Sequence, residues 1–289
     1  MRNLLKDLRY AQFNSAFLRR LLSHYFKENR VYRILWGPLR GARMHYDRTV
    51  NYHTILGLWE LENFHFLKRL FIQAKLLHPG MVVCDLGANI GAFSLWFSRK
   101  VGDRGRVYAF EPAAPVRGML EKNLALNHAG NVQVVAKACS DQTGKVKFYV
   151  ADDPLVSSLY ENWTADWKIP SREVWVEATT LDDYFHGSQP RNGPDFIKMD
   201  IEGGGVVALR GCDVCVERNR PVFLVESHFP PEDEAISALL VRHGYQAYRI
   251  NNARWVQKTG KIYPDPEGVW GKLILCPPEK RDTLARVLP

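Results

Sequence analysis

The pattern of apolar residues changes near residue 80. Before that point, apolar residues between Leu4 and Leu22 recur three or four positions apart with Arg and Lys between them, which predicts one or two amphipathic helices. After it, short apolar runs alternate with helical stretches at 92–100 and 116–127. The expected strands are 81–86, 106–111, 132–135, 195–200, 221–226, 245–250 and 272–276. This alternation predicts βαβ units and an α/β fold with a mostly parallel sheet.

Three further segments depart from this pattern. Residues 145–150 and 173–178 alternate polar and apolar side chains, which predicts an edge or hairpin insertion. Residues 151–171 contain Trp163 and Trp167 without useful periodicity. Long segments of that kind often serve as lids or binding loops, so we expect this one to contact a substrate.

Charge is distributed unevenly along the 289 residues. Residues 1–50 contain 11 Lys and Arg against 3 Asp and Glu, whereas residues 51–289 contain 28 of each. We therefore predict a basic helical N-terminal extension at 1–50 and a neutral domain at 51–289. The neutral domain argues against a nucleic-acid substrate, while the extension remains open to weak contact with an anionic membrane surface or an acidic partner.

Other sequence properties suggest a cellular location. No stretch of 18 apolar residues is present, and the N-terminus lacks the apolar region and cleavage site of a signal peptide. Five cysteines are sparse and odd in number. These properties favour the reducing cytoplasm.

A glycine turn follows the strand predicted at 81–86. Gly87 and Gly91 would let the backbone approach a bound nucleotide, with the N-terminus of the following helix facing the ligand. Glu111 ends the next strand, 20 residues after Gly91. A carboxylate there is placed to accept hydrogen bonds from both hydroxyls of a ribose.

Two classes of enzyme compete at this point, a nicotinamide dehydrogenase and an S-adenosylmethionine-dependent methyltransferase. The turn G-A-N-I-G lacks the middle glycine that admits a pyrophosphate in the dinucleotide motif. Asp85, two residues before the first glycine, would repel a diphosphate. S-adenosylmethionine instead carries an ammonium, a sulfonium and no phosphate, so charge favours the methyl donor.

A series of motifs in this order resembles the FkbM family of class I methyltransferases. The motifs are DLGANIGAFSLWFSRKVGDRGRVYAFEP, KNLALN, ACSDQTG, TTLDDYF and FIKMDIEGGGVVALRG, flanked by LGLWE and VFLVESH. The resemblance covers residues 52 to about 276. It implies a Rossmann-like, seven-stranded, mostly parallel sheet with helices on both faces, and S-adenosylmethionine as cofactor. It also implies methyl transfer to a hydroxyl of a sugar, a polyketide or another natural product.

The resemblance also implies roles for individual residues. Asp85, Gly87, Asn89 and Gly91 would line the methionyl end of the cofactor. Ala88 and Asp200 would also bind the cofactor, and the turn at Asp200 would lie beside the reactive methyl group. Glu111 would hold the ribose, and Ser140 and Asp141 would lie at the adenine edge.

One position departs from the family pattern. The family usually has D-x-E-G-x-E after the fourth strand, whereas Gly205 occupies the last position here. A carboxylate that would pair with a nearby cation or cap the following helix is therefore missing from that position.

Methyl transfer to oxygen requires a group that takes the proton of the acceptor. His228 is the expected general base, because an ordinary histidine pKa of about 6.5 suits proton transfer near neutral pH. Glu226 would orient His228 or replace it, and Asp200 with Glu202 is the alternative base or acceptor-binding pair. Lys198 lies on the same strand face as Asp200 and needs a carboxylate partner such as Glu202 or Glu226.

The same residues raise the question of a metal. Carboxylates with His228 would suit a divalent cation, but their spacing does not require one, so we predict no metal. Tyr52, His53, Trp59 and Glu60 form a second group suited to stacking on the acceptor.

The sequence as a whole predicts a cytoplasmic O-methyltransferase that acts on a small-molecule hydroxyl. The alternatives are methylation of nitrogen or of a macromolecule, and a protein that keeps the cofactor without catalysing a reaction.

Overall fold

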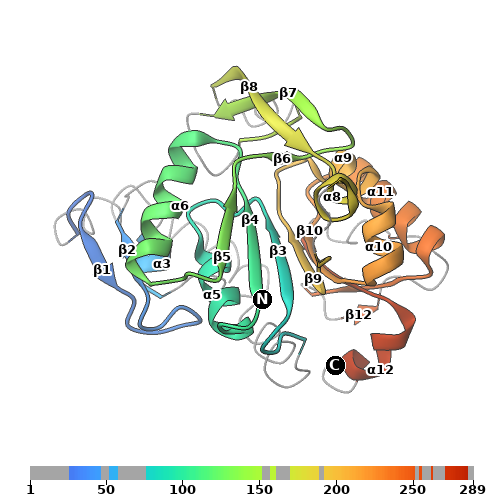
Figure 1. Cartoon of the computed structure of the whole chain (residues 1–289), viewed down its shortest axis with the longest axis horizontal. Helices are drawn as coiled ribbons and strands as arrows, with labels where there is room; N and C mark the ends of the chain where they lie inside the picture. The colour runs from blue at the N-terminus through green and yellow to red at the C-terminus, as the bar shows by residue number, and fades with distance from the viewer. Residues whose placement is uncertain are drawn as a thin grey trace, which may run out of the picture.

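The computed structural model describes residues 26–46, 52–57, 76–151, 157–160, 170–188, 192–250, 254–255, 262 and 271–285. An eight-stranded sheet forms its centre (Figure 1). In spatial order the strands are β12 (Arg254–Trp255), β11 (Gln246–Arg249), β13 (Lys272–Cys276), β10 (Val222–Glu226), β9 (Phe196–Met199), β3 (Val82–Leu86), β4 (Arg106–Phe110) and β5 (Val132–Val135). The seven predicted strands are confirmed, and the two-residue β12 adds an eighth at one edge.

The direction of the strands makes the sheet mostly parallel, as predicted. β5, β4, β3, β9 and β10 pair in parallel, whereas β13 runs antiparallel between β10 and β11. The chain builds outward from β3 on one side and from β9 on the other, so the strand order reverses between these two neighbours. In open α/β sheets, the crevice at the carboxyl ends beside such a reversal is where ligands bind.

Helices cover both faces of the sheet, as the alternation of side chains along each strand requires. The helices are α5 (Ala92–Val101), α6 (Ala114–Leu126), α8 (Leu181–His186), α9 (Gly205–Arg210), α10 (Asp213–Asn219), α11 (Pro230–His243) and α12 (Arg281–Ala285), with a 3-10 turn at Pro278–Lys280. Val83 belongs to one buried cluster with Phe97 of α5 and Leu120 of α6. Its neighbour Cys84 belongs to a second cluster with Phe185 of α8, on the side of α8 to α11.

A second sheet of three strands lies beside the main one (Figure 1). Its strands are β6 (Ala138–Cys139), β8 (Ser171–Thr179) and β7 (Gly144–Ala151), in that spatial order. β7 pairs antiparallel with residues 171–178 of β8 over its whole length. The predicted hairpin insertion is thereby confirmed.

The described residues before the main sheet include a small hairpin. β1 (Val31–Arg33) and β2 (Arg43–His45) pair antiparallel, and β2 packs on α6. A short helix, α3 (Tyr52–Ile55), follows. Within the helical extension predicted at 1–50, residues 31–33 and 43–45 form strands instead, because the two segments pair with each other and the second packs on α6. The helices predicted between Leu4 and Leu22 lie outside the described residues, and the boundary at residue 50 stays a prediction. Within the described ranges, no helix combines the length and apolar character needed to cross a membrane.

Asn123 connects this hairpin to the core. Its side chain is fully buried, accepts a hydrogen bond from His45 N at 3.0 Å and donates one to Ile90 O at 3.0 Å. Asn127, one helical turn further and less buried, makes an equivalent pair of hydrogen bonds with Arg43 N and O.

Asn123→Ala should lower the free energy of unfolding by about 2–3 kcal/mol, because the buried Ile90 carbonyl and the half-buried His45 N–H lose their partners. Asn127→Ala is the matched control and should cost under about 1 kcal/mol, since water can reach the exposed Arg43. Denaturant unfolding measures both values. Equal losses in the two variants would contradict the assigned role of Asn123.

Candidate active site

The glycine turn after β3 lies tightly against two neighbouring strands. Gly87 has a φ of 74°, and a Cβ there would lie 2.0 Å from the carbonyl oxygen of Asp200. Gly91 has a φ of 92°, and a Cβ there would lie 2.6 Å from Leu120 Cδ1. The N–H groups of Gly87 and Ala88 donate to Phe110 O at 3.1 and 3.0 Å. Backbone conformation and space therefore both require glycine at position 87, whereas at position 91 the left-handed backbone favours it.

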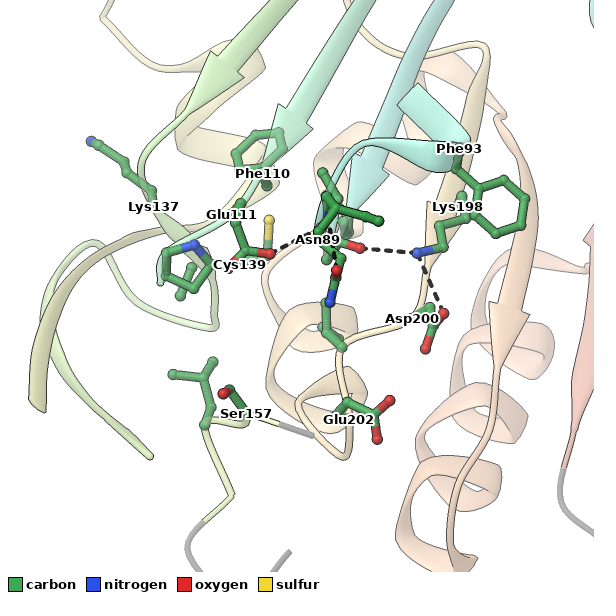
Figure 2. A pocket seen from close by; sticks show the side chains of 18 of the residues that line it. Asn89, Phe93, Phe110, Glu111, Lys137, Cys139, Ser157, Lys198, Asp200 and Glu202 are labelled. Atoms are coloured by element: carbon green, nitrogen blue, oxygen red, sulfur yellow. Dashed lines mark hydrogen bonds and ion pairs between the residues drawn. The ribbon is translucent and has the colours of Figure 1, made fainter. Parts of the chain in front are cut away.

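Glu111 faces this turn from the end of β4 (Figure 2). Its side chain is buried, with Oε2 accepting from Asn89 N at 3.0 Å and Oε1 from Ala113 N at 3.0 Å. A carboxylate has about four lone-pair directions, so two remain for a ligand. Burial raises the pKa of Glu111 to about 7, although the two backbone N–H groups, Lys198 and Arg117 oppose that rise.

Lys198 connects the carboxylates at the ends of β3 and β9, and Figure 2 shows its contact with Asp200. Its ammonium lies 3.5 Å from Asp85 Oδ1 and 3.4 Å from Asp200 Oδ2, and it donates to Gly87 O at 3.1 Å. Ser94 Oγ donates to Asp85 Oδ2 at 2.6 Å. The partners expected from the sequence, Glu202 or Glu226, were therefore wrong, because the Lys198 side chain points to the neighbouring strand β3.

These contacts determine the charge of each group. Burial alone would lower the pKa of Lys198, but Asp200 and Asp85 outweigh it and raise the pKa above its ordinary value. Burial also opposes the ionisation of Asp200, yet Lys198 and His228 hold the pKa of Asp200 below its ordinary value. Burial raises the pKa of Asp85, against Lys198 and Ser94.

His228 lies among three carboxylates at the end of β10. Its Nε2 is 3.6 Å from Asp200 Oδ1 and 3.7 Å from Glu202 Oε2, while Nδ1 is 3.1 Å from Glu232 Oε2. Burial opposes protonation of the ring, but these carboxylates outweigh it and raise the pKa of His228 to about 11. The assumption of an ordinary pKa, on which the general-base prediction for His228 depended, does not hold in this arrangement.

Glu232 holds His228 in place of the predicted Glu226. Glu226 pairs instead with Lys272, which lies opposite it on β13. Glu232 is 2% exposed, and its Oε2 also accepts from His228 N at 2.7 Å. The sequence carries a signal that we did not use: two prolines begin α11, and an acidic residue in the first turn of a helix often has a local role.

Glu232 also explains the departure at Gly205. Its Oε1 accepts from Gly205 N at 3.0 Å, at the start of α9, and a Cβ at Gly205 would lie 2.6 Å from that oxygen. The capping carboxylate missing from position 205 is thus supplied by α11. Gly205 leaves the space that this carboxylate occupies.

A cavity of about 220 Å³ opens at the carboxyl ends of β3, β4 and β9 (Figure 2). Its lining includes Gly87, Ala88, Asn89, Glu111, Lys198, Asp200 and Glu202 from the predicted site, together with Phe110, Lys137, Cys139, Phe148, Ser157 and Leu159. The second sheet and residues 157–159, which lie between its strands β7 and β8, therefore cover one side of the cavity, which we did not predict.

Four residues predicted to contact the cofactor are not part of the cavity wall: Asp85, Gly91, Ser140 and Asp141. Asp85 is fully buried against Ser94 and Lys198, so it acts through Lys198 and does not reach the cavity. Gly91 ends the lining turn, but its neighbour Ile90 forms the wall. Lys137, Ala138 and Cys139 line the cavity, whereas Ser140 and Asp141 follow directly after them. Ser140 Oγ donates to Asp141 Oδ1 at 3.3 Å, and Asp141 lies 3.9 Å from Arg210 Nη1. Their place at the adenine edge stays a prediction.

The residues predicted to bind the acceptor are outside the described part of the chain. These are Trp59, Glu60, Trp163, Trp167 and the side chains of Tyr52 and His53. Of the segment 151–171, the structure describes 151, 157–160 and 170–171. Ser158 Oγ donates to the carbonyl of Glu202, and the Tyr160 ring lies 5.2 Å from that of Phe229. Residues 157–160 therefore pack against the loops after β9 and β10.

The cavity fits S-adenosylmethionine and its charges. The two glycines of the turn leave room for a ligand close to the backbone, and Glu111 offers free lone pairs for ribose hydroxyls. The anionic Asp200 faces the cavity, and the turn lacks the middle glycine that would admit a phosphate. Together with the strand order, this site defines a class I S-adenosylmethionine-dependent methyltransferase.

Comparison with known proteins identifies the family. The sequence model of the Methyltransferase FkbM domain matches residues 85–247, more than half of the chain. The chain therefore belongs to the FkbM methyltransferase family, which confirms the resemblance seen in its motifs.

Individual relatives match only in part. Methyltransferase sdnD of Sordaria araneosa is 33% identical over 156 residues, which cover 45% of this chain and 60% of sdnD. AMB antimetabolite synthetase AmbE of Pseudomonas aeruginosa is 39% identical over 95 residues, which cover 31% of this chain and 4% of AmbE. The crystal structure of Methyltransferase FkbM from Methylobacillus flagellatus KT aligns with a TM-score of 0.47 and 17% identity, over 78% of this chain and 55% of that chain.

The raised pKa of Glu111 predicts pH-dependent cofactor affinity. In the predicted contact, an ionised carboxylate accepts hydrogen bonds from both ribose hydroxyls better than a protonated one, so affinity for S-adenosylhomocysteine should fall as the pH drops through its pKa of about 7. The limit is about tenfold for each pH unit below that value. Calorimetric titration of the wild type, Glu111→Gln and the exposed control Glu121→Gln measures this. A pH profile of Glu111→Gln as steep as that of the wild type would contradict the assignment.

Because Glu232 takes the place of the family's acidic residue at position 205, we predict that substitutions at these two positions compensate each other. Gly205→Glu alone should lower the thermal unfolding temperature, since it forces a side chain against the buried Glu232 carboxylate. Combining it with Glu232→Ala should recover a large part of the loss, because one carboxylate again occupies the space. Additive losses in the double variant would show that the two positions do not share one role.

Proposed function

We propose that this methyltransferase transfers the methyl group of S-adenosylmethionine to a hydroxyl oxygen of a small molecule. The observation that carries the proposal is the cluster of Asp200, Glu202 and His228 at the ends of β9 and β10, two of whose members line the cofactor cavity. A hydroxyl must lose its proton during methylation, and this cluster lies where an acceptor would meet the cofactor.

The reaction is a direct displacement at carbon. A lone pair of the acceptor oxygen forms the new O–CH₃ bond while the C–S bond breaks, and its electron pair stays on sulfur to give S-adenosylhomocysteine. The proton of the hydroxyl passes to a carboxylate of the cluster, because the raised pKa of His228 keeps its ring protonated near neutral pH, and from there to water. The chain aligns the reactants: the glycine turn and Glu111 hold the cofactor, and the turn after β9 places Asp200 and Glu202 beside it.

The charge around the cavity supports a cationic methyl donor. Asp85 and Asp200 flank Lys198, and Asp200 and Glu202 lie beside the ring of His228, so three carboxylates face two cationic groups. A sulfonium that becomes a neutral thioether is compatible with such surroundings. The alternative of a non-catalytic protein depended on the missing carboxylate at Gly205, and Glu232 supplies that carboxylate.

Two observations support a small acceptor over a macromolecule. Residues 51–289 carry equal numbers of basic and acidic residues, whereas an RNA substrate favours an excess of cations. The similarity to a protein named an antimetabolite synthetase supports an acceptor among natural products. A cytoplasmic location and weak contacts made by residues 1–50 belong to the same proposal.

His228→Ala tests the assignment of the cluster. We expect kcat to fall about 100-fold, while the affinity for S-adenosylhomocysteine changes less than about threefold. The matched control is His243→Ala, which removes a histidine paired with Asp213 outside the cavity. The assay follows the mass of one added methyl group across a panel of hydroxylated and aminated natural products. Methylation of amines alone would contradict the proposed O-methylation, and full activity of His228→Ala would remove the cluster from the reaction.

A further inference from the structure

Three side chains near the cavity have the spacing of metal ligands. One ligand atom each from Asp200, Glu202 and His228 lies within 4.8 Å of the others. Nε2 of His228 is 3.6 and 3.7 Å from the two carboxylate oxygens. Around an ion with bonds of about 2.1 Å, neighbouring ligand atoms are about 3.0–3.4 Å apart. The two distances from His228 Nε2 exceed this spacing by only a few tenths of an ångström, and the two carboxylate oxygens lie within 4.8 Å of each other, so small side-chain shifts would bring the three atoms onto a cation.

A second carboxylate behind the histidine supports this interpretation. Glu232 is buried and fixed by Gly205 N, and its Oε2 lies 3.1 Å from Nδ1 of His228. Histidines that bind metals commonly donate their other ring N–H to a carboxylate, which fixes the tautomer and the ring orientation. Here that arrangement directs Nε2 toward Asp200 and Glu202.

The backbone of Glu202 is also built to present its side chain. Its φ is 47°, in the left-handed region that side chains other than glycine rarely adopt. Ser158 Oγ holds its carbonyl group. Strained residues persist where the surrounding structure maintains them, and they gather at functional sites.

The net charge around the three side chains is negative and therefore favours a cation. Asp85, Asp200, Glu202 and Glu232 contribute four carboxylates, against the ammonium of Lys198 and the ring of His228. Negative groups are in excess even when the ring is charged. A divalent cation would offset that excess and would take the place of the ring proton at Nε2.

We propose that Asp200, Glu202 and His228 bind a divalent cation, for which Mn²⁺ is the best match, at the edge of the cofactor cavity. Carboxylate oxygens suit Mg²⁺ and Mn²⁺, and the imidazole favours Mn²⁺ of the two. Asp200 and Glu202 line the cavity, so the free positions of the ion would face an acceptor. The ion would bind the acceptor hydroxyl and assist the loss of its proton to water; this role rests on the proposed function.

The test is titration of the full-length protein with Mn²⁺, followed by the electron paramagnetic resonance signal of the free ion. The wild type should bind one ion per chain. Glu202→Gln and His228→Gln should weaken binding at least tenfold, and Glu232→Gln about 10–100-fold. Asp213→Asn removes a carboxylate that faces another histidine and should leave the affinity unchanged. Thermal unfolding and S-adenosylhomocysteine binding confirm that each variant is folded.

The possible results separate this inference from the proposed function. A wild type that binds S-adenosylhomocysteine but no stoichiometric Mn²⁺ overturns the metal site and leaves the methyl transfer intact. Equal losses in Asp213→Asn and Glu202→Gln overturn it as well, because binding would then be unspecific. Tighter binding of Mg²⁺ than of Mn²⁺ in a competition titration would contradict the choice of ion. Specific Mn²⁺ binding without methylation of any hydroxyl would support the site and refute its proposed role.

Discussion

The buried ammonium of Lys198 is the interaction on which the rest of the site depends. Removing an ammonium from water is expensive unless several partners replace the water. Here Asp85 lies opposite Lys198 in the parallel pairing of β3 with β9, and Asp200 and Gly87 O complete its surroundings. The same contacts fix the glycine turn and the loop after β9 against each other. The contacts that neutralise Lys198 thus hold in place the two loops that line the cofactor cavity.

The carboxylate of Glu232 shows that a side chain from another helix can take over the hydrogen bond that the family pattern assigns to position 205. The family pattern places an acid at the position of Gly205, and the sequence alone therefore indicates a missing group. In the structure α11 delivers a carboxylate to the same backbone N–H and extends it to His228. The Glu232 carboxylate occupies the space that the absent side chain at Gly205 leaves. This relation becomes apparent only from the packing of α9 against α11.

Local signals explain which features were predictable from the sequence. The strands follow from apolar runs, and the turn follows from Gly87, Gly91 and the spacing to Glu111, all of which act within one βαβ unit. The partners of Lys198 were not predictable in this way, because they depend on the register between two strands far apart in the chain. The coverage of the cavity by Phe148 and Ser157 depends likewise on how a separate sheet docks.

The most direct test of the account is a crystal structure of the protein with S-adenosylhomocysteine. The account predicts the ribose hydroxyls within hydrogen-bond distance of Glu111, the glycine turn against the methionyl part, and the sulfur facing the cluster of Asp200, Glu202 and His228. A cofactor bound away from Glu111, or with its sulfur turned from that cluster, would contradict it.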